Sequence, residues 1–256
     1  MAVTIQIGLS IGNSRYHWGW FLNTKFQSSW DTEYLNVDRY LDLLPIDCHR
    51  IITHEKLELD RIPIYLVSVV PSQTEIWRQL PQVKLITLAD IPLLDLYPTL
   101  GIDRALTIFG AGNLYGYPIL VIDGGTALTI TGVDDKYRLV GGAILPGLRL
   151  QLRSLSIGTA ALPEIILPPQ LPPRWSNNTP GAIASGILHT VSAGVSDFIR
   201  DWQQLFPASY IILTGGDGEL LTGYLQAISV DLATKVRCDR DLLFAGLSAI
   251  LKISSC

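Results

Sequence analysis

One short pattern occurs twice in this chain, 113 residues apart, and it constrains the fold more than any other feature. In each copy an apolar stretch runs into a tight bend of small polar residues, and a second apolar stretch begins at once. The copies span residues 7–19 and 120–132, and the matched positions are Ser10 with Asp123, Gly12 with Gly125, Asn13 with Thr126, and Gly19 with Gly132. The repeat predicts two lobes, each built on a strand, a turn and a second strand.

Turns of this composition can bind phosphate, because they present backbone N–H groups to an anion. The structural alternative is an ordinary hairpin turn with glycine and asparagine at positive φ. The second copy adds a carboxylate, since Asp123 ends an apolar strand directly before two glycines. A carboxylate there either caps local N–H groups or lies near a cation that accompanies phosphate. Because the pattern is duplicated, we favour a clamp around the phosphates of a nucleotide.

Composition limits the class of protein and its partners. The chain has 256 residues, of which 48% are apolar and 16% are charged, so it can bury the cores of two modest domains. The formal net charge of −4 provides no general attraction to a phosphodiester backbone. Nucleic acid is therefore not an expected partner.

The cysteines indicate a reducing compartment. Cys48, Cys238 and Cys256 are odd in number, widely spaced and without a CxxC pair, as expected of free thiols. The four histidines lack the spacing of metal ligands. The N-terminus has no basic stretch before an apolar run, and apolar runs such as 64–70 are too short to span a bilayer. We expect a soluble, cytoplasmic protein with no membrane partner.

Strand and helix patterns alternate in both halves, which is typical of the α/β class. Strands are expected at residues 3–9, 15–21, 62–70, 83–88, 119–122, 128–133 and 209–213, with a further one following residues 137–141. Helices are expected at residues 72–80, 105–115, 181–206 and 241–253, and a further one within residues 144–155, after a turn at Pro146 and Gly147. Ser72 is the expected N-cap of the first helix, with Glu75 completing a capping box. Residues 162–180 hold six prolines and predict a long ordered loop. The lobes are expected at 1–116 and 117–256.

Two further segments suggest binding or catalysis. Asp103 and Arg104 precede a helical pattern, where the structural interpretation makes Asp103 an N-cap. In the functional interpretation Asp103 accepts a proton from a substrate hydroxyl and Arg104 binds an anionic group. Both interpretations can hold, because a helix N-terminus also favours anions. Gly215 and Gly216 end a strand, and such glycines either form a turn or let a flat base approach the backbone.

One glycine cluster imitates a nucleotide-binding motif. Residues 110–116 resemble a dinucleotide fingerprint, but that motif needs a preceding strand and a long following helix. Here Pro118 and a strand follow almost at once, so these glycines are interpreted as helix-end and close-packing positions. The chain also lacks the Gly-x-x-x-x-Gly-Lys-Ser/Thr pattern of an ordinary P-loop.

Taken in order, the motifs of this chain resemble those of the type III pantothenate kinases, which belong to the acetate and sugar kinase, Hsp70 and actin superfamily. The matching segments are IGNS (11–14), VSVVPSQT (67–74), YPTLGIDR (97–104), DGGTALT (123–129), GGAILPGLRLQL (141–152), NTPGAIASG (178–186), LTGGDGELL (213–221) and LLFAGL (242–247). Each segment is modest alone, but the ordered set spans nearly the whole chain and is specific.

The resemblance implies a duplicated actin-like, ribonuclease H-like fold of two lobes, with mixed sheets flanked by helices and ATP in the cleft. It implies transfer of the γ-phosphate of ATP to the 4′-hydroxyl of pantothenate, the first step of coenzyme A biosynthesis. It also implies a homodimer that uses Mg²⁺ and needs a monovalent cation, K⁺ or NH₄⁺.

Carried over by position, the resemblance assigns roles to single residues. Asp103 would be the general base, and Arg104 would help hold the substrate or the transferring phosphate. Tyr97 and Gly101 belong to the segment lining the pantothenate pocket, and Thr179 matches a threonine that reaches pantothenate across a dimer interface. Asp123 would be near the metal, and the ATP-binding residues would be Ser10, Gly12, Asn13, Ser14, Gly125, Thr126, Gly215 and Gly216.

Ser10 departs from the family pattern, because the first phosphate loop usually begins with an aspartate. The change removes one anchor for hydrated Mg²⁺, although Mg²⁺ often binds through only one or two carboxylates, so that Asp123 can suffice. One alternative function is therefore a catalytically weak or inactive relative that binds nucleotide and acts as a regulator. Another is a kinase with a different small acceptor. Retention of Asp103 and Arg104 favours the active pantothenate kinase over the regulator, and the segments GIDR (101–104) and NTPGA (178–182) argue against a different acceptor.

Overall fold

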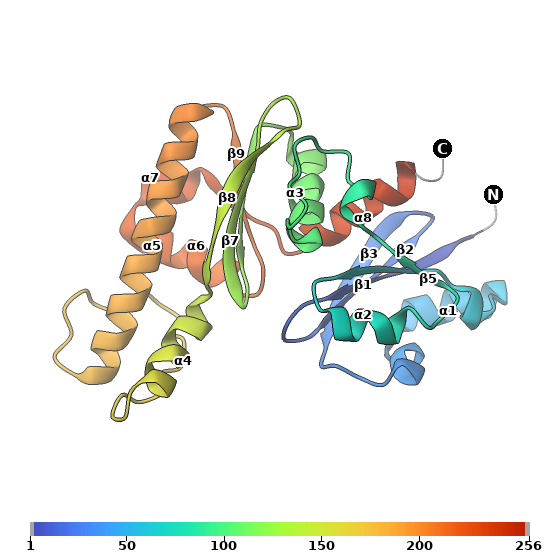
Figure 1. Cartoon of the computed structure of the whole chain (residues 1–256), viewed down its shortest axis with the longest axis horizontal. Coiled ribbons are helices and arrows are strands. Elements are labelled where there is room, and N and C mark those ends of the chain that lie inside the picture. Colours follow the sequence, from blue (N-terminus) through green and yellow to red (C-terminus); the bar gives the residue numbers. More distant parts are fainter. Residues whose placement is uncertain (1–2, 254–256) are drawn as a thin grey trace. The chain divides into compact units, whose positions relative to one another are not determined.

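The computed structural model describes residues 3–253, and the chain divides into two compact units (Figure 1). Unit 1 consists of residues 3–114 together with 241–253, and unit 2 consists of residues 115–240. Both units are α/β, as predicted. The first boundary lies close to the division expected at 116/117. The terminal helix, however, belongs to unit 1, whereas the sequence division assigned it to the second lobe.

Unit 1 is built on a five-stranded mixed sheet in the order β3-β2-β1-β4-β5. Its strands are β1 (Ile5–Ile11), β2 (Tyr16–Leu22), β3 (Lys25–Thr32), β4 (Ile64–Ser68) and β5 (Val83–Leu85). β1 is antiparallel to β2 and parallel to β4, and every residue of β1 is buried. The helices are α1 (Ile46–Glu55), α2 (Pro71–Trp77), α3 (Ile102–Tyr115) and α8 (Leu242–Ile253), with short 3-10 turns at Val37–Leu43, Leu59–Arg61 and Leu88–Asp90.

Glycines let α8 pack directly against the sheet and against α3 within unit 1. Gly19 lies on β2, and a Cβ at this position would lie 2.6 Å from the Phe244 ring. α8 also crosses α3 closely, since a Cβ on Gly110 would lie 2.1 Å from the Leu242 carbonyl oxygen and one on Gly246 would lie 2.2 Å from that of Leu106. The close-packing role predicted for the glycine cluster at 110–116 is confirmed at Gly110.

Unit 2 repeats this plan with the order β10-β9-β6-β7-β8. Its strands are β6 (Ile119–Gly124), β7 (Ala127–Val133), β8 (Leu139–Pro146), β9 (Tyr210–Thr214) and β10 (Val236–Cys238). The helices are α4 (Leu148–Gly158), α5 (Thr179–Leu205), α6 (Gly218–Ile228) and α7 (Val230–Thr234). β6 is antiparallel to β7 and parallel to β9, as β1 is to β2 and β4. The predicted duplication is therefore confirmed at the level of topology.

The register of the repeat differs by one residue from the sequence match. Four residues separate the paired ends of β1 and β2, but three separate those of β6 and β7. Gly19 consequently pairs with Gly8, whereas Gly132 pairs with Leu120. The match of Gly19 with Gly132 was therefore wrong by one position beyond the turn, because the second turn is one residue shorter.

The proline-rich segment is an ordered strap held against the helices of unit 2. The hydroxyl of Ser185 on α5 donates to the Arg174 carbonyl (2.6 Å), and His189 Nε2 lies 2.9 Å from the Pro172 carbonyl oxygen. The Tyr224 hydroxyl on α6 donates to the Pro168 carbonyl. These bonds confirm the predicted long ordered loop, although its last two residues, Thr179 and Pro180, already belong to α5.

Among the described helices, α5 alone is long and apolar enough to cross a bilayer. Half of that window is buried inside the protein, where Leu188, Val195 and Ile199 join the core of unit 2. A long core helix of a soluble protein has the same length and composition, so this feature is weak evidence for a membrane span.

Candidate active site

The first predicted phosphate turn joins β1 to β2 and leaves Asn13 and Ser14 exposed. The Gly12 amide already donates to the Arg15 carbonyl (3.2 Å), and the Tyr34 hydroxyl donates to the Gly12 carbonyl. Neither Gly12 nor Asn13 has a positive φ, so the hairpin alternative based on positive φ is wrong. Asn13 and Ser14, together with the exposed Arg15, are accessible to a ligand at this turn.

Ser10 is only 4% exposed and lies on β1 directly opposite His17 on β2. The next strand places Asp31 opposite His17, and the His17 Nδ1 to Asp31 Oδ1 distance is 2.6 Å. Arg15 lies 3.3 Å from the other oxygen of Asp31. The end of β1 therefore carries a buried hydroxyl, and the carboxylate of Asp31 lies two strands away on β3.

The start of α3 brings the predicted acceptor-side residues of unit 1 together. The helix begins at Ile102, so Asp103 lies in its first turn and is not its N-cap. Asp103 Oδ1 accepts from the Arg104 amide (2.8 Å), and Arg104 Nη1 donates to the Tyr97 hydroxyl (3.1 Å). A Cβ on Gly101 would lie 2.5 Å from Asp103 Oδ1, so the missing side chain gives the carboxyl room.

Burial decides the electrostatics of Asp103. It raises the pKa of this carboxyl, and it outweighs the Arg104 amide and the Arg104 charge, which both lower the pKa. Arg104 is itself buried, at 8% exposure, although it carries a permanent charge. A buried arginine beside a carboxyl of raised pKa is an arrangement typical of functional sites.

The second turn is held from outside by α4. The Gly125 amide donates to the Ala127 carbonyl (3.1 Å), and the Thr126 carbonyl accepts from the Gly147 amide (2.9 Å). A Cβ on Gly147 would lie 2.0 Å from the Gly125 carbonyl oxygen, so only glycine lets α4 begin this close to the turn. Thr126 is exposed. The start of α4 therefore fixes the turn while leaving its tip accessible.

Asp123 and the paired glycines meet at the ends of β6 and β9. Asp123 pairs with Thr214, and a Cβ on Gly215 would lie 2.2 Å from Asp123 Oδ1. Gly215 also has a φ of +83°, so this position requires glycine twice over. Gly216 is exposed with open space before its Cα, which suits the approach of a flat base.

The donor set fits Mg²⁺ bound mainly through water and phosphate. Asp123 is partly buried at the tip of a strand, and its Oδ1 faces Gly215 and Gly125, whose lack of side chains leaves space beside it. Mg²⁺ keeps several waters and often uses only one or two carboxylates with substrate phosphates. No cluster of three His, Cys, Asp or Glu side chains occurs among residues 3–253, so an all-protein cage is not what this turn supplies.

Two charged residues of unit 2 were not predicted as part of the site. Arg149 on α4 and Asp217 before α6 form an ion pair of 3.1 Å, and Asp217 is 5% exposed. The Asp217 amide donates to the Gly124 carbonyl (2.8 Å), which ties it to the second turn. The sequence signal was available, since both residues lie inside the matched segments PGLR and TGGD.

Thr179 lies on a different element from the other predicted site residues of unit 2. It is exposed as the first residue of α5, and Asn178 before it caps the helix by accepting from the Gly181 amide (2.9 Å).

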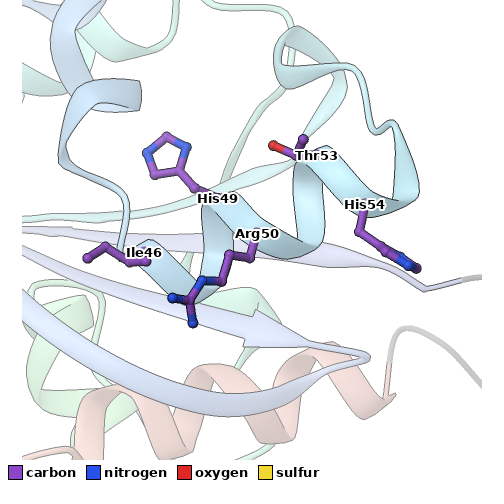
Figure 2. Close-up of a pocket in the computed structure, with 5 residues that line it drawn as sticks. All are labelled: Ile46, His49, Arg50, Thr53 and His54. Atoms are coloured by element: carbon purple, nitrogen blue, oxygen red, sulfur yellow. The ribbon is translucent and has the colours of Figure 1, made fainter.

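A surface hollow of about 520 Å³ lies on unit 1, but it involves none of the predicted residues (Figure 2). It is lined by one helix, α1, through Ile46, His49, Arg50, Thr53 and His54. Arg50 is paired with Asp47 (3.3 Å) and His54 with Glu55 (2.9 Å). The hollow therefore adds nothing to the two turns or to the start of α3.

Similar folds occur among solved structures. A putative Baf family transcriptional activator from Campylobacter jejuni has a TM-score of 0.59 at 20% identity, covering 97% of this chain and 98% of that one. The activator of 2-hydroxyisocaproyl-CoA dehydratase from Clostridium difficile, solved with bound ADPNP, has a TM-score of 0.54 at 10% identity, covering 97% and 94%. At these identities the likeness concerns the fold alone, and it agrees with the expected α/β fold of two mixed sheets flanked by helices.

Sequence comparison is more specific. The family model for type III pantothenate kinase matches residues 7–201. The type III pantothenate kinase of a Synechocystis species is 45% identical over 246 residues, covering 95% of this chain and 89% of the relative. That of a Nostoc species is 43% identical over 258 residues, covering 96% and 94%. The chain therefore belongs to the type III pantothenate kinase family.

Proposed function

We propose that this protein transfers the γ-phosphate of ATP to the 4′-hydroxyl of pantothenate, the first step of coenzyme A biosynthesis. Membership of a family of kinases supports the reaction class and the two substrates. In a soluble enzyme of this kind the reaction takes place in the cytoplasm, where free thiols such as buried Cys48 persist.

The observation that carries the proposal is the pair formed by Asp103 and Arg104. Asp103 is the general base: its raised pKa makes the ionised carboxylate a stronger proton acceptor than an exposed aspartate. Arg104 is held by Tyr97, and its buried guanidinium binds the anionic acceptor or the phosphoryl group in transit. Phosphoryl transfer depends mainly on such positioning and charge neutralisation.

ATP binds through both turns in this proposal. Ser10 and residues 12–14 serve the phosphates in unit 1, and Gly125 and Thr126 serve them in unit 2. Gly215 and Gly216 lie against the adenosine, where the open space before Gly216 accommodates the base. Asp123 holds Mg²⁺, which when bound neutralises the phosphate charge, and a monovalent cation, K⁺ or NH₄⁺, completes the requirement.

A homodimer is part of the proposal, with Thr179 contributing to the pantothenate pocket of a second subunit. Unit 2 leaves large apolar side chains exposed on β8, α4 and the strap, and these are Ile144, Ile157, Ile166 and Trp175. Trp175 is 89% exposed, and covering so large an apolar side chain at an interface would remove its area from water. Sedimentation analysis should give a dimer for the parent and a weaker dimer for Trp175→Ser. A monomeric parent would contradict this part.

The activity is tested with purified protein, ATP, Mg²⁺, K⁺ and pantothenate in a coupled assay. Asp103→Asn and Ser10→Asp are assayed beside the parent. Turnover by the parent that is lost in Asp103→Asn is the expected result. A parent without turnover would favour a nucleotide-binding regulator, and turnover only in Ser10→Asp would show that the missing carboxylate had disabled the enzyme.

A further inference from the structure

An ion pair lies beside the second turn, and the proposed function gives it no role. Arg149 Nη2 is 3.1 Å and Arg149 Nε is 3.2 Å from the same oxygen, Oδ1 of Asp217. The Asp217 side chain is 7% exposed, whereas that of Arg149 is 65% exposed. Asp217 is therefore a buried carboxylate whose counter-charge comes from the surface of α4.

Both partners are anchored to the turn by the backbone. The Asp217 amide donates to the Gly124 carbonyl, and a Cβ on Gly124 would lie 3.5 Å from Asp217 Cβ. On the other side, the N-cap of α4 is Gly147, two residues before Arg149, and its amide donates to the Thr126 carbonyl (2.9 Å). The ion pair consequently links the start of α4 to the bend before α6, and the backbone of each is hydrogen-bonded to the turn or to the strand end before it.

The charges around Gly124 make this ion pair important for the binding of an anionic ligand. Asp123 precedes Gly124, and Asp217 packs against it, so two carboxylates flank the strand end that leads into the turn. A polyphosphate there meets like charge in a partly dry site, where salt screens poorly. Asp123 can be offset by a cation that accompanies the phosphates, but Asp217 faces Arg149.

We propose that Arg149 is a positioning residue for the nucleotide: it neutralises Asp217 and thereby lets the second turn accept the phosphate chain. This inference rests on the proposed ATP site at residues 125–126. Arg149 acts through Asp217 and not on the nucleotide directly. Its effect must therefore grow with the number of phosphates and must disappear when Asp217 carries no charge.

The test is calorimetric titration of the full chain with adenosine, AMP, ADP and a non-hydrolysable ATP analogue. The variants are Arg149→Ala, Asp217→Asn and the double variant. Arg153→Ala is the matched control, since Arg153 is an exposed arginine one turn further along α4. Thermal unfolding of each variant is recorded in parallel, and the double variant lacks the unpaired buried charge that could unfold Arg149→Ala.

The expected result is that Arg149→Ala lowers the affinity for the ATP analogue by about tenfold or more. The affinity for ADP should fall by less, and that for adenosine should hardly change. The double variant should recover to within a few-fold of the parent, and Arg153→Ala should match the parent throughout. If the affinities for adenosine and for the ATP analogue fell equally, the inference would be overturned, and the ion pair would be purely structural.

A double variant as weak as Arg149→Ala would also overturn it, because Arg149 would then contact the phosphates itself. If Arg149→Ala does not fold, the decision falls to the double variant: phosphate-dependent weakening there overturns the inference, and parent-like affinity in a folded protein supports it. A parent that fails to bind the ATP analogue would instead contradict the proposed ATP site, which separates the two failures.

Discussion

At the scale of single residues, the carboxyl of Asp103 is partly buried and accepts a hydrogen bond from the Arg104 amide (2.8 Å). In Asp103→Asn, turnover should fall by about 10²–10⁴-fold, since the amide cannot accept the hydroxyl proton. The amide oxygen can still accept from the backbone, and the cost of burying a charge disappears. The melting temperature near neutral pH should therefore stay the same or rise. A variant that loses turnover together with several degrees of stability would point to a structural role instead.

In the proposed mechanism the raised pKa of Asp103 also sets the acid limb of the activity profile. As a base the carboxyl must be ionised, so kcat/KM for pantothenate should fall as the pH drops through this raised pKa. Because burial shifts the pKa upward, the limb should lie above the range of an ordinary aspartate, whose pKa is about 3.9. A profile measured from about pH 9 down to the lowest pH at which the protein stays folded checks this. Residual activity in Asp103→Asn should lack the limb, and a limb that persisted there would belong to another group.

Single residues of the site were predictable where neighbours in sequence carry the pattern. Asp103, Arg104 and the two turns each lie in one short segment, so their chemistry could be predicted from the sequence. Arg149 and Asp217 are 68 positions apart, and only the fold of unit 2 brings them together. Periodicity and local motifs carry no information on such a pair, because its attraction exists only after α4 and the bend before α6 have docked on the turn.

At the scale of elements, strands β1, β2 and β4–β9 and helices α2, α3, α4, α5 and α8 were predicted, whereas β3, β10, α1, α6 and α7 were missed. β3 was missed because its residues are mostly polar and it lies at the edge of the sheet with one neighbour. α1 was missed because it is rich in charged and polar residues and buries only Cys48 and Ile52. For α2 the predicted cap at Ser72 is wrong: Pro71 is the first helical residue, where its missing N–H has no cost, and Val70 is the cap.

The crossing of α3 and α8 supplies a test of element packing. In Gly110→Ala the new methyl group would lie 2.1 Å from the Leu242 carbonyl oxygen, so the helices must separate. The free energy of unfolding should fall by about 1–3 kcal/mol. Gly194→Ala on α5 is the matched control, because nothing lies within 4 Å of its Cβ position. Alanine there should stabilise the helix by up to about 1 kcal/mol. Equal effects of the two substitutions in urea unfolding would show that the crossing is not tight.

At the scale of the whole molecule, the two units differ in how the chain completes them. Unit 2 is continuous, and its ends are joined to each other, since the Tyr115 hydroxyl donates to Asp239 Oδ2 (2.7 Å) and the Arg237 guanidinium lies over the Tyr115 ring. Unit 1 is discontinuous and needs α8 from the far end of the chain. The duplication alone did not predict this, because sequence order suggests that each lobe ends where the next begins.

This asymmetry predicts different behaviour of fragments. Residues 115–240 have their own sheet and core, so this fragment should unfold cooperatively when followed by circular dichroism in urea. Residues 1–114 should not, because they lack five large buried side chains of α8, Leu242, Phe244, Leu247, Ile250 and Leu251. At about 1.5–3 kcal/mol each, these approach the whole stability of an ordinary domain, about 5–15 kcal/mol.

Restoring α8 is the decisive comparison for unit 1. Residues 1–114 joined to 241–256 through a flexible Gly/Ser linker should recover a cooperative transition, because α8 crosses α3 closely at Gly110 and Gly246 and is held within reach. The same fragment carrying the linker without α8 is the control. If residues 1–114 alone unfolded as cooperatively as the joined form, α8 would be an addition to a self-sufficient lobe. The observed burial of Phe244 and Leu247 against Gly8 and Gly19 argues that it is instead part of the core.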